Sequence, residues 1–244
     1  MSGNSLEERD SSVLAIMAKW PQVGQVKTRL CPPLTPEQAT HLYQGFLFDT
    51  IALITLLNQV KLAVAFTPPD SETAFRKVLP SSIALFPQQG NDLGERLSHL
   101  MIEFFHQGYQ KVVITSTDSP TLPAQFLQQA FDLLATHQVV LGPCDDGGYY
   151  LIGSDAPYPS LFREITWSSE RVLAETLERA RASDLHVTLL PSWYDIDQAE
   201  DLLRLWDDAR QLRQQGAIWP NHTLAYLETL EGQLFTRGAA GGNS

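Results

Sequence analysis

The fold is decided by residues 111–120, which read KVVITSTDSP. Residues 112–115 form a run of apolar and β-branched side chains without polar alternation, which is typical of a strand covered by helices on both faces. A turn-forming Thr-Asp-Ser-Pro sequence ends the run, so Asp118 directly follows the strand. Ligands of open α/β sheets bind outside the carboxyl ends of the strands, and this position therefore makes Asp118 a candidate site residue.

Apolar runs of the same kind recur on both sides of this strand. Three clear runs lie at residues 13–17, 62–66 and 139–141. Three weaker runs lie at residues 83–86, 149–152 and 187–190. Helical stretches fill the gaps, at residues 36–57, 71–79, 93–107, 123–136, 169–182 and 198–214. This alternation predicts a single-domain α/β fold with a mixed, mostly parallel sheet flanked by helices.

The predicted domain covers residues 13–214, because no linker rich in Pro or Gly divides it. Residues 1–12 are polar and acidic and lack the apolar centre of a signal peptide, so we expect a disordered tail there. Residues 215–235 predict a peripheral C-terminal helix, and the Gly- and Ala-rich residues 236–244 predict a second disordered tail.

The overall charge limits the classes of partner. The chain has 28 acidic and 17 basic residues, a formal net charge of -11, which repels nucleic acid and anionic lipid. Its longest apolar run, residues 51–57, is far shorter than the roughly 20 residues of a membrane span. Cys31 and Cys144 lie far apart without metal-binding spacing, which argues against a disulfide scaffold and a structural zinc. We expect a soluble cytoplasmic protein, a monomer or homodimer, with neither nucleic acid nor membrane as a partner.

Several common enzyme motifs are absent from the sequence. It contains no GxxxxGK[ST] loop, no GxGxxG after the first strand, no GxSxG and no HExxH. These absences argue against P-loop nucleotide hydrolases, dinucleotide oxidoreductases, serine hydrolases and zincins. What remains is a set of charged residues at the ends of predicted strands.

The loop after the first strand is rich in cations. Lys19, Lys27 and Arg29 lie within eleven residues of an otherwise acidic chain, and Gly24 allows close approach of a ligand to the backbone. Lysine and arginine donors at such a loop would bind a polyphosphate. The alternative is a solvated loop with cations by chance.

Acidic residues follow two other predicted strands and suggest a divalent cation. Magnesium is usually bound by one or two carboxylates together with substrate phosphates, so Asp118 is the leading metal ligand. Asp195 and Asp197 are two residues apart and would face the same side of an extended segment, where they could complete the metal shell. Each of these acids has an alternative role: Asp118 as a turn residue only, and Asp197 as the cap of the following helix in a capping box with Glu200.

A further candidate segment follows residues 139–141 and contains two acids, two glycines and two tyrosines. Gly147 and Gly148 remove side-chain bulk beside Tyr149, which gives a cleft wall that a sugar or another acceptor could approach. Adjacent residues point apart, so we choose Asp146 over Asp145 as the catalytic acid or base. The alternative is that Asp-Gly only forms a tight hairpin turn. Cys144 is expected to be a small buried residue.

Taken together, in this order and at these separations, the segments resemble a family of bacterial glycosyltransferases linked to arsenosugar biosynthesis, formerly a domain of unknown function. The resemblance runs from about residue 14 to residue 205. Its motifs are KWP at 19–21, KTRL at 27–30, DLGERL at 92–97, DSPTLP at 118–123, LGP at 141–143, DGGYYLIG at 146–153, TWS at 166–168 and DID at 195–197. Thr117 and Gln25 depart from the pattern, which usually has Gly and a basic residue there.

The resemblance implies a nucleotide-diphospho-sugar transferase fold of the GT-A, Rossmann-like type. It implies a nucleotide-sugar donor over the strand ends, a small-molecule acceptor, and Mg²⁺ or Mn²⁺ on the donor diphosphate at Asp118, Asp195 and Asp197. It also implies a set of substrate-binding residues, namely Lys19, Gly24, Lys27, Arg29, Arg96, Gly147, Gly148, Tyr149 and Trp167, with Asp146 and Lys27 as catalytic residues.

Three hypotheses about function follow. The first is a metal-dependent glycosyltransferase in which Lys27 and Arg29 neutralise the departing nucleoside diphosphate and Asp146 orients or deprotonates the acceptor. The second is a nucleotidyltransferase similar to the guanylyltransferases that act on phospholactate, which also carry a Lys-Thr/Ser-Arg-Leu stretch and a late Asp-x-Asp. The third is a nucleotide-sugar binding module without turnover.

Overall fold

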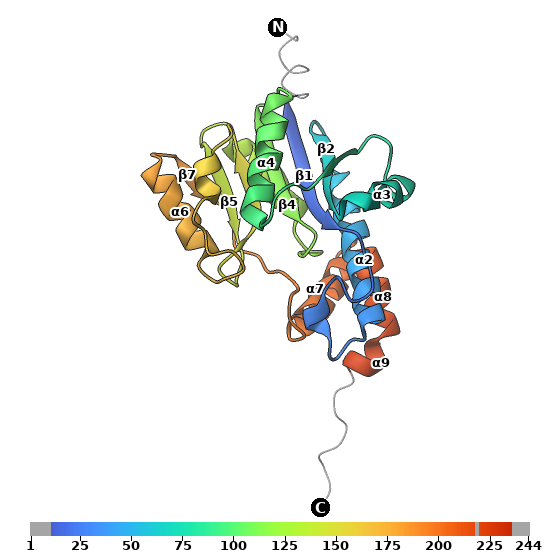
Figure 1. Ribbon diagram of the computed structural model, residues 1–244. Helices are drawn as coiled ribbons and strands as arrows, with labels where there is room; N and C mark the ends of the chain where they lie inside the picture. The colour runs from blue at the N-terminus through green and yellow to red at the C-terminus, as the bar shows by residue number, and fades with distance from the viewer. Residues whose placement is uncertain (1–10, 218–219, 236–244) are drawn as a thin grey trace, which may run out of the picture.

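The computed structural model describes residues 11–217 and 220–235 and contains a seven-stranded sheet (Figure 1). The strands are β1 Ser12–Lys19, β2 Lys61–Thr67, β3 Ala84–Pro87, β4 Lys111–Ser116, β5 Val139–Pro143, β6 Tyr149–Ser154 and β7 Val187–Leu189. They lie in the order β3-β2-β1-β4-β6-β5-β7. All pairs are parallel except those of β6, which is antiparallel to both β4 and β5. The predicted mixed, mostly parallel sheet is confirmed, including its three weaker strands.

Most helices form layers on the two faces of the sheet, and the last three lie beside these layers. They are α2 Pro36–Ile54, α3 Glu72–Val78, α4 Leu93–His106, α5 Ala124–Leu133, α6 Val172–Ala182, α7 Asp201–Gln214, α8 Asn221–Thr229 and α9 Glu231–Leu234. Short 3₁₀ turns occur at η1 Thr28–Leu30, η2 Pro69–Ser71 and η3 Pro159–Phe162. One buried cluster joins the sheet to α2, α3 and α5, and the other joins it to α4, α6 and η3. Among the described helices, none is long and apolar enough to cross a membrane.

Alternating side chains of the central strand explain why its sequence is apolar throughout. Leu14 and Ile16 of β1 belong to the first cluster, whereas Val13 and Ala15 belong to the second. Successive residues of a strand point to opposite faces, so a strand covered on both faces must be apolar at every position.

A third buried cluster lies beyond the carboxyl end of β1, where α7, α8 and the first half of α2 meet (Figure 1). The carboxylate of Asp49, on α2, accepts hydrogen bonds from the backbone N–H groups of His222 and Thr223 at 3.0 and 2.7 Å. Pro220 precedes α8 and offers no side-chain cap, so Asp49 supplies the acceptor that the helix start requires. This cluster holds the acidic segment before α7 against the sheet.

The C-terminal region differs from the single helix expected over residues 215–235. It forms α8 and α9, with Leu230 between them, while residues 218–219 lie outside the described range. The helices lie beside the sheet layers, and Leu224 and Leu227 of α8 are buried in the third cluster. The tails expected at residues 1–12 and 236–244 lie outside the described residues except for residues 11–12, and Ser12 already belongs to β1.

Candidate active site

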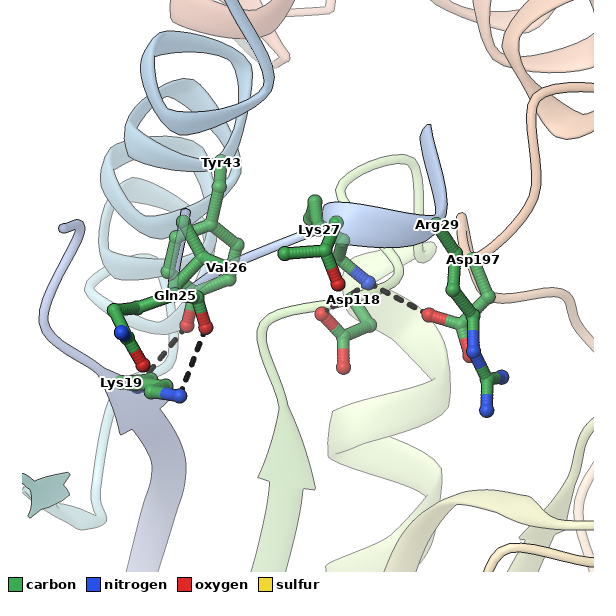
Figure 2. A pocket seen from close by; sticks show the side chains of 9 residues that line it. Lys19, Gln25, Val26, Lys27, Arg29, Tyr43, Asp118 and Asp197 are labelled. Carbon is green, nitrogen blue, oxygen red and sulfur yellow. Dashed lines mark hydrogen bonds and ion pairs between the residues drawn. The ribbon is translucent and has the colours of Figure 1, made fainter. Parts of the chain in front are cut away.

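The site is built around one buried ammonium group. Lys27 Nζ lies 2.6 Å from Asp118 Oδ1 and 2.8 Å from Asp197 Oδ1 (Figure 2). Three segments far apart in sequence meet there: the loop after β1, the turn after β4 and the segment before α7. The Lys27 side chain is 7% exposed, and its backbone is left-handed with φ 46° at the start of η1. The local geometry turns this side chain inward, away from the surface loop that carries it.

The charge of this lysine is held by its partners. Burial alone lowers the pKa of Lys27, but the carboxylates of Asp118 and Asp197 raise it by more, so the pKa lies above its ordinary value. Lys27 therefore carries a positive charge throughout the physiological pH range. The expected cationic first loop and the expected acidic residues are brought together by this interaction.

Backbone hydrogen bonds fix the two acidic segments relative to each other. The Asp118 carbonyl accepts a hydrogen bond from the Ile196 N–H at 2.9 Å, and the Asp118 N–H donates to Ser116 Oγ at 3.2 Å. The first of these bonds joins the turn after β4 to the middle residue of Asp195-Ile196-Asp197. The two segments are thus held together independently of any ligand.

The alternative role of Asp197 as a helix cap is wrong. The helix α7 begins at Asp201, and the Asp201 carboxylate accepts hydrogen bonds from the N–H groups of Asp197 and Gln198 at 2.8 and 2.7 Å. Glu200 precedes the helix without a side-chain cap, and the Asp201 side chain closes the turn that leads into it. The Asp197 side chain is consequently free to point at Lys27.

Asp195 occupies a more buried position next to this group. Burial and the charge of Asp118 together raise the pKa of Asp195 to about 6, although a hydrogen bond donated by Ser119 Oγ opposes the rise. The thiol of Cys144 lies beside it, buried as expected, and both burial and the charge of Asp195 raise the pKa of that thiol. The elevated pKa of Cys144 makes it a poor nucleophile.

Tyr43 of α2 is a site residue that the sequence did not indicate. Its hydroxyl accepts a hydrogen bond from the Lys19 N–H at 3.0 Å and lies 2.9 Å from Thr117 Oγ1. Burial raises the pKa of Tyr43 to about 12, with a further contribution from Asp118. The Thr117 departure from the family pattern is therefore accommodated, because its hydroxyl pairs with this phenol. A tyrosine inside an amphipathic helix gives no signal in the sequence beyond that of a core aromatic.

Two adjoining cavities open from the Lys27 cluster. The first has a volume of about 270 Å³ and is lined by Lys19, Gln25, Val26, Lys27, Thr28, Arg29, Tyr43, Asp118 and Asp197. The second has a volume of about 340 Å³ and is lined by Arg29, Leu93, Asp146, Gly148, Tyr149, Trp167, Ser168, Ser169, Glu170, Val172, Asp195 and Asp197. Arg29 and Asp197 line both, so the cavities share a border. The lining of the first cavity includes three cationic side chains. The lining of the second includes one cationic side chain, four carboxylates and two large aromatic side chains.

The hairpin between β5 and β6 forms one wall of the second cavity. Asp146 Oδ1 accepts a hydrogen bond from the Gly148 N–H at 2.9 Å, which confirms the hairpin-turn interpretation of this sequence without excluding a second role. Gly147 has φ +86° and lies so close to the chain that a Cβ there would be 2.1 Å from the Glu170 carbonyl oxygen. The hairpin can therefore pack against the segment before α6 only because this position is glycine.

The segment of residues 164–170, which we call the strap, adjoins the hairpin and also lines the second cavity. A Cβ at Gly94, near the start of α4, would lie 2.5 Å from Trp167 Nε1, so the indole lies directly on this glycine. The Glu175 carboxylate of α6 accepts hydrogen bonds from the Thr166 N–H at 2.6 Å and from Thr166 Oγ1 at 3.1 Å. The strap is thereby held at Thr166 and at Trp167.

The remaining predicted residues lie around or away from these cavities. Lys19 donates a hydrogen bond from Nζ to the Gln25 carbonyl at 2.8 Å at the edge of the first cavity (Figure 2). Gly24 is exposed, with no atom within 4 Å of the place of a Cβ. Arg96 lines a separate cavity of about 380 Å³ with Gln88 and His99, so the structure does not bring it to Lys27. Roles of these residues in binding stay predictions.

The donor set at Lys27 is compatible with a divalent cation. One oxygen of Asp118 and one of Asp197 converge on a single point, and carboxylate oxygens are the ligands that Mg²⁺ and Mn²⁺ prefer. Within residues 11–217 and 220–235, no group of three or more His, Cys, Asp or Glu side chains is arranged to hold a metal ion. The residues therefore fit a cation held by two carboxylates together with ligand oxygens, and a third ligand at Asp195 stays a prediction.

Comparisons with known proteins agree with this fold. The family described as "Uncharacterized protein conserved in bacteria (DUF2064)" matches residues 50–169. A solved structure from Desulfovibrio desulfuricans G20, provisionally assigned as a nucleotide-diphospho-sugar transferase, is 32% identical with a TM-score of 0.85, over 92% of this chain and 97% of that chain. The fold is thus that of the nucleotide-diphospho-sugar transferases.

Two further relatives are nucleotidyltransferases by name. The 2-phospho-L-lactate guanylyltransferase of Methanothermobacter thermautotrophicus is 26% identical over 182 residues, which are 72% of this chain and 76% of the relative. A cytidylyltransferase from Leptospira borgpetersenii shares the fold at 13% identity, with a TM-score of 0.53 over 93% of this chain and 98% of that chain. The fold therefore serves transfer from nucleotide-based donors of more than one kind.

Proposed function

The chain belongs to the DUF2064 family of bacterial proteins, and from its site we propose that it is a glycosyltransferase that moves a sugar from a nucleotide-diphospho-sugar donor to a hydroxylated acceptor. The observation that carries this proposal is the buried contact of Lys27 with Asp118 and Asp197 at the carboxyl end of the sheet. A cationic cavity at that position suits a diphosphate, because charged donors bind phosphate oxygens strongly.

The second cavity supports a sugar-bearing substrate. An aromatic side chain packs against the C–H face of a sugar ring, and carboxylate oxygens accept hydrogen bonds from sugar hydroxyls. Trp167 and Tyr149 supply the first kind of contact, and Asp146 and Glu170 supply the second. The excess of carboxylates over cations there favours a neutral polyhydroxyl compound over a phosphorylated one.

The proposed chemistry breaks the bond between the anomeric carbon and the diphosphate oxygen and forms a bond between that carbon and the acceptor oxygen. Asp146 accepts the acceptor proton at Oδ2, since its Oδ1 already accepts the Gly148 N–H. Lys27 and Arg29 stabilise the negative charge that develops on the departing nucleoside diphosphate. A divalent cation held by Asp118 and Asp197 would supply further charge stabilisation on the diphosphate.

A second candidate is nucleotidyl transfer, and the similarity to the guanylyltransferase over three quarters of that relative favours it. The first cavity would then bind a nucleoside triphosphate, and pyrophosphate would be the leaving group. A non-catalytic nucleotide-binding module would instead be stabilised by nucleotides without turnover. The arsenosugar connection stays a prediction, since the described contacts do not select an arsenic-bearing substrate.

One assay separates these candidates. The protein is incubated with Mg²⁺ or Mn²⁺ and a panel of UDP-, GDP- and dTDP-sugars or the corresponding triphosphates, and free nucleoside diphosphate and pyrophosphate are measured. Diphosphate release supports glycosyl transfer, pyrophosphate release supports nucleotidyl transfer, and thermal stabilisation without either product supports binding alone.

A matched pair of variants tests the role of Asp146. Asp146→Asn should lower the turnover number by about 100-fold or more, the usual contribution of a positioned base. Asp145→Asn is the control, because Asp145 pairs with Arg204 at 2.8 Å and lines neither cavity. Equal turnover in the two variants would remove Asp146 from the mechanism.

A further inference from the structure

We propose that Tyr43 binds the donor directly, by donating a hydrogen bond from its hydroxyl to an oxygen of the diphosphate. The inference rests on the proposed function and adds a neutral donor to the cations that would hold the diphosphate. Tyr43 lines the first cavity, and its side chain points from α2 toward Lys19 at the edge of that cavity (Figure 2).

The hydrogen bonds of a buried hydroxyl pair decide which proton is available to a ligand. The Tyr43 hydroxyl accepts a hydrogen bond from the Lys19 N–H at 3.0 Å, and it lies 2.9 Å from Thr117 Oγ1. The two hydroxyl groups hold two protons, but only one of these protons can lie between the two oxygens. The other proton needs an acceptor elsewhere.

Burial decides between the two possible arrangements. Thr117 is 2% exposed and does not line the first cavity, and its hydroxyl has no partner other than Tyr43 among the described residues. If Tyr43 donated to Thr117, the Thr117 proton would be buried without an acceptor, which is unfavourable. Thr117 therefore donates to Tyr43, and the Tyr43 proton is left for an acceptor in the cavity.

The Tyr43 proton differs from the protons of the two lysines in the first cavity, which already bind protein oxygens. Lys27 Nζ contacts two carboxylates, and Lys19 Nζ donates to the Gln25 carbonyl. A diphosphate oxygen has to compete with these oxygens for the ammonium groups, whereas no group of the described chain accepts the Tyr43 proton. Burial raises the pKa of Tyr43 to about 12, so the hydroxyl keeps this proton at neutral pH. A hydrogen bond to a charged phosphate oxygen is also stronger than one between neutral groups.

Calorimetric titration tests this hydrogen bond. The probes are UDP, GDP and inorganic pyrophosphate at a fixed concentration of Mg²⁺, because pyrophosphate carries the diphosphate without a nucleoside. Tyr43→Phe should weaken the binding of each probe that the wild type binds by at least about tenfold, since it removes a hydrogen bond to a charged group. Thr117→Val should change the same affinities by less than about threefold, because it leaves the Tyr43 proton in place.

Tyr158→Phe is the matched control for the loss of a hydroxyl that both accepts and donates. Tyr158 accepts a hydrogen bond from Gln138 Nε2 at 3.1 Å and donates one to Asp155 Oδ1 at 2.8 Å, and it lines neither cavity of the site. This variant should bind all three probes as the wild type does. The Thr117 variant separates binding from a structural role. If the hydroxyl pair only joined α2 to the turn after β4, Thr117→Val would weaken binding as much as Tyr43→Phe.

The outcomes distinguish this inference from the proposed function. Unchanged affinities in Tyr43→Phe, or an equal loss in Thr117→Val, would overturn the inference and leave glycosyl transfer untouched. A loss confined to Tyr43→Phe, in a protein that releases no nucleoside diphosphate from any sugar donor, would support the inference and reject the proposed function. A wild type that binds none of the three probes would overturn both. If Tyr43→Phe does not fold, Thr117→Val decides: retained affinity supports the inference, and a loss above threefold overturns it.

Discussion

The contact between the β5–β6 hairpin and the strap leads to a sharp prediction at Gly147. In Gly147→Ala, the new Cβ would lie 2.1 Å from the Glu170 carbonyl oxygen and 2.7 Å from Glu170 Cα, whereas ordinary contact begins at 3.4 Å. The strap or the hairpin must therefore move by about 1 Å, since overlap of this kind with backbone atoms cannot be relieved by a rotamer change.

The expected loss of stability combines two effects. An alanine with a left-handed backbone lowers the free energy of unfolding by about 1 kcal/mol relative to glycine. Overpacking against a fixed backbone lowers it by a further amount of about 1–3 kcal/mol. A total near 3 kcal/mol would lower Tm by roughly 6–12 °C in a domain of this size. Displacement of the second cavity's wall by about 1 Å should reduce the rate of transfer by about 100-fold.

Gly108→Ala is the matched control, because Gly108 has φ +93° and no atom within 4 Å of the place of a Cβ. It should lose only the cost of the left-handed backbone, about 1 kcal/mol, and retain full activity. Thermal unfolding and the release of nucleoside diphosphate are measured for both variants. Equal losses of stability in the two would refute the reasoning, because the contact with Glu170 would then contribute nothing.

Three other predictions concern distant parts of the chain and the metal. Asp49→Asn should lower the free energy of unfolding by about 2 kcal/mol, since a buried acceptor of two N–H groups loses its charge, whereas Asp132→Asn at the surface should change it by less than about 0.5 kcal/mol. Glu175→Gln should raise KM for the acceptor and alter Trp167 fluorescence. The hydrogen bond from the Thr166 N–H lowers the pKa of Glu175, so the stabilisation it provides is present above the ordinary carboxyl pKa and is lost as pH falls through the lowered pKa. The unfolding curves of wild type and variant should therefore converge in acid. Removal of divalent cations by EDTA should abolish release of nucleoside diphosphate, and Mn²⁺ or Mg²⁺ should restore it.

The sheet was predictable because burial of both strand faces leaves a direct trace in the sequence. A run such as residues 62–66 can be nothing but apolar when helices cover both sides, and all predicted strands are present. Helix starts were less predictable: α6 and α7 begin at Val172 and Asp201, three residues after the predicted starts. Turns rich in Ser, Asp and Gln precede both helices and resemble a first helical turn in composition.

The sequence allowed the charged residues of the site to be predicted, but it did not allow the contacts between them to be predicted. Strand ends place Lys27, Asp118 and Asp197 at one edge of the sheet, which follows from topology alone. The direct bridge by Lys27 depends on a left-handed backbone at a non-glycine residue, and local sequence does not encode that conformation. The part played by Tyr43 likewise depends on how α2 crosses the loop after β1, a tertiary relation that helical periodicity does not reveal.

The reversal of β6 has a consequence for how such proteins can diversify. The loops after β1 and β4 carry the cations and Asp118, while the hairpin and the strap hold Asp146 and Trp167 on separate stretches of chain. Under the proposed function, selection can therefore change which compound receives the transferred group by altering only the hairpin and the strap, while the loops after β1 and β4 stay the same. Relatives with one donor and many different recipients are the evolutionary pattern that this architecture permits.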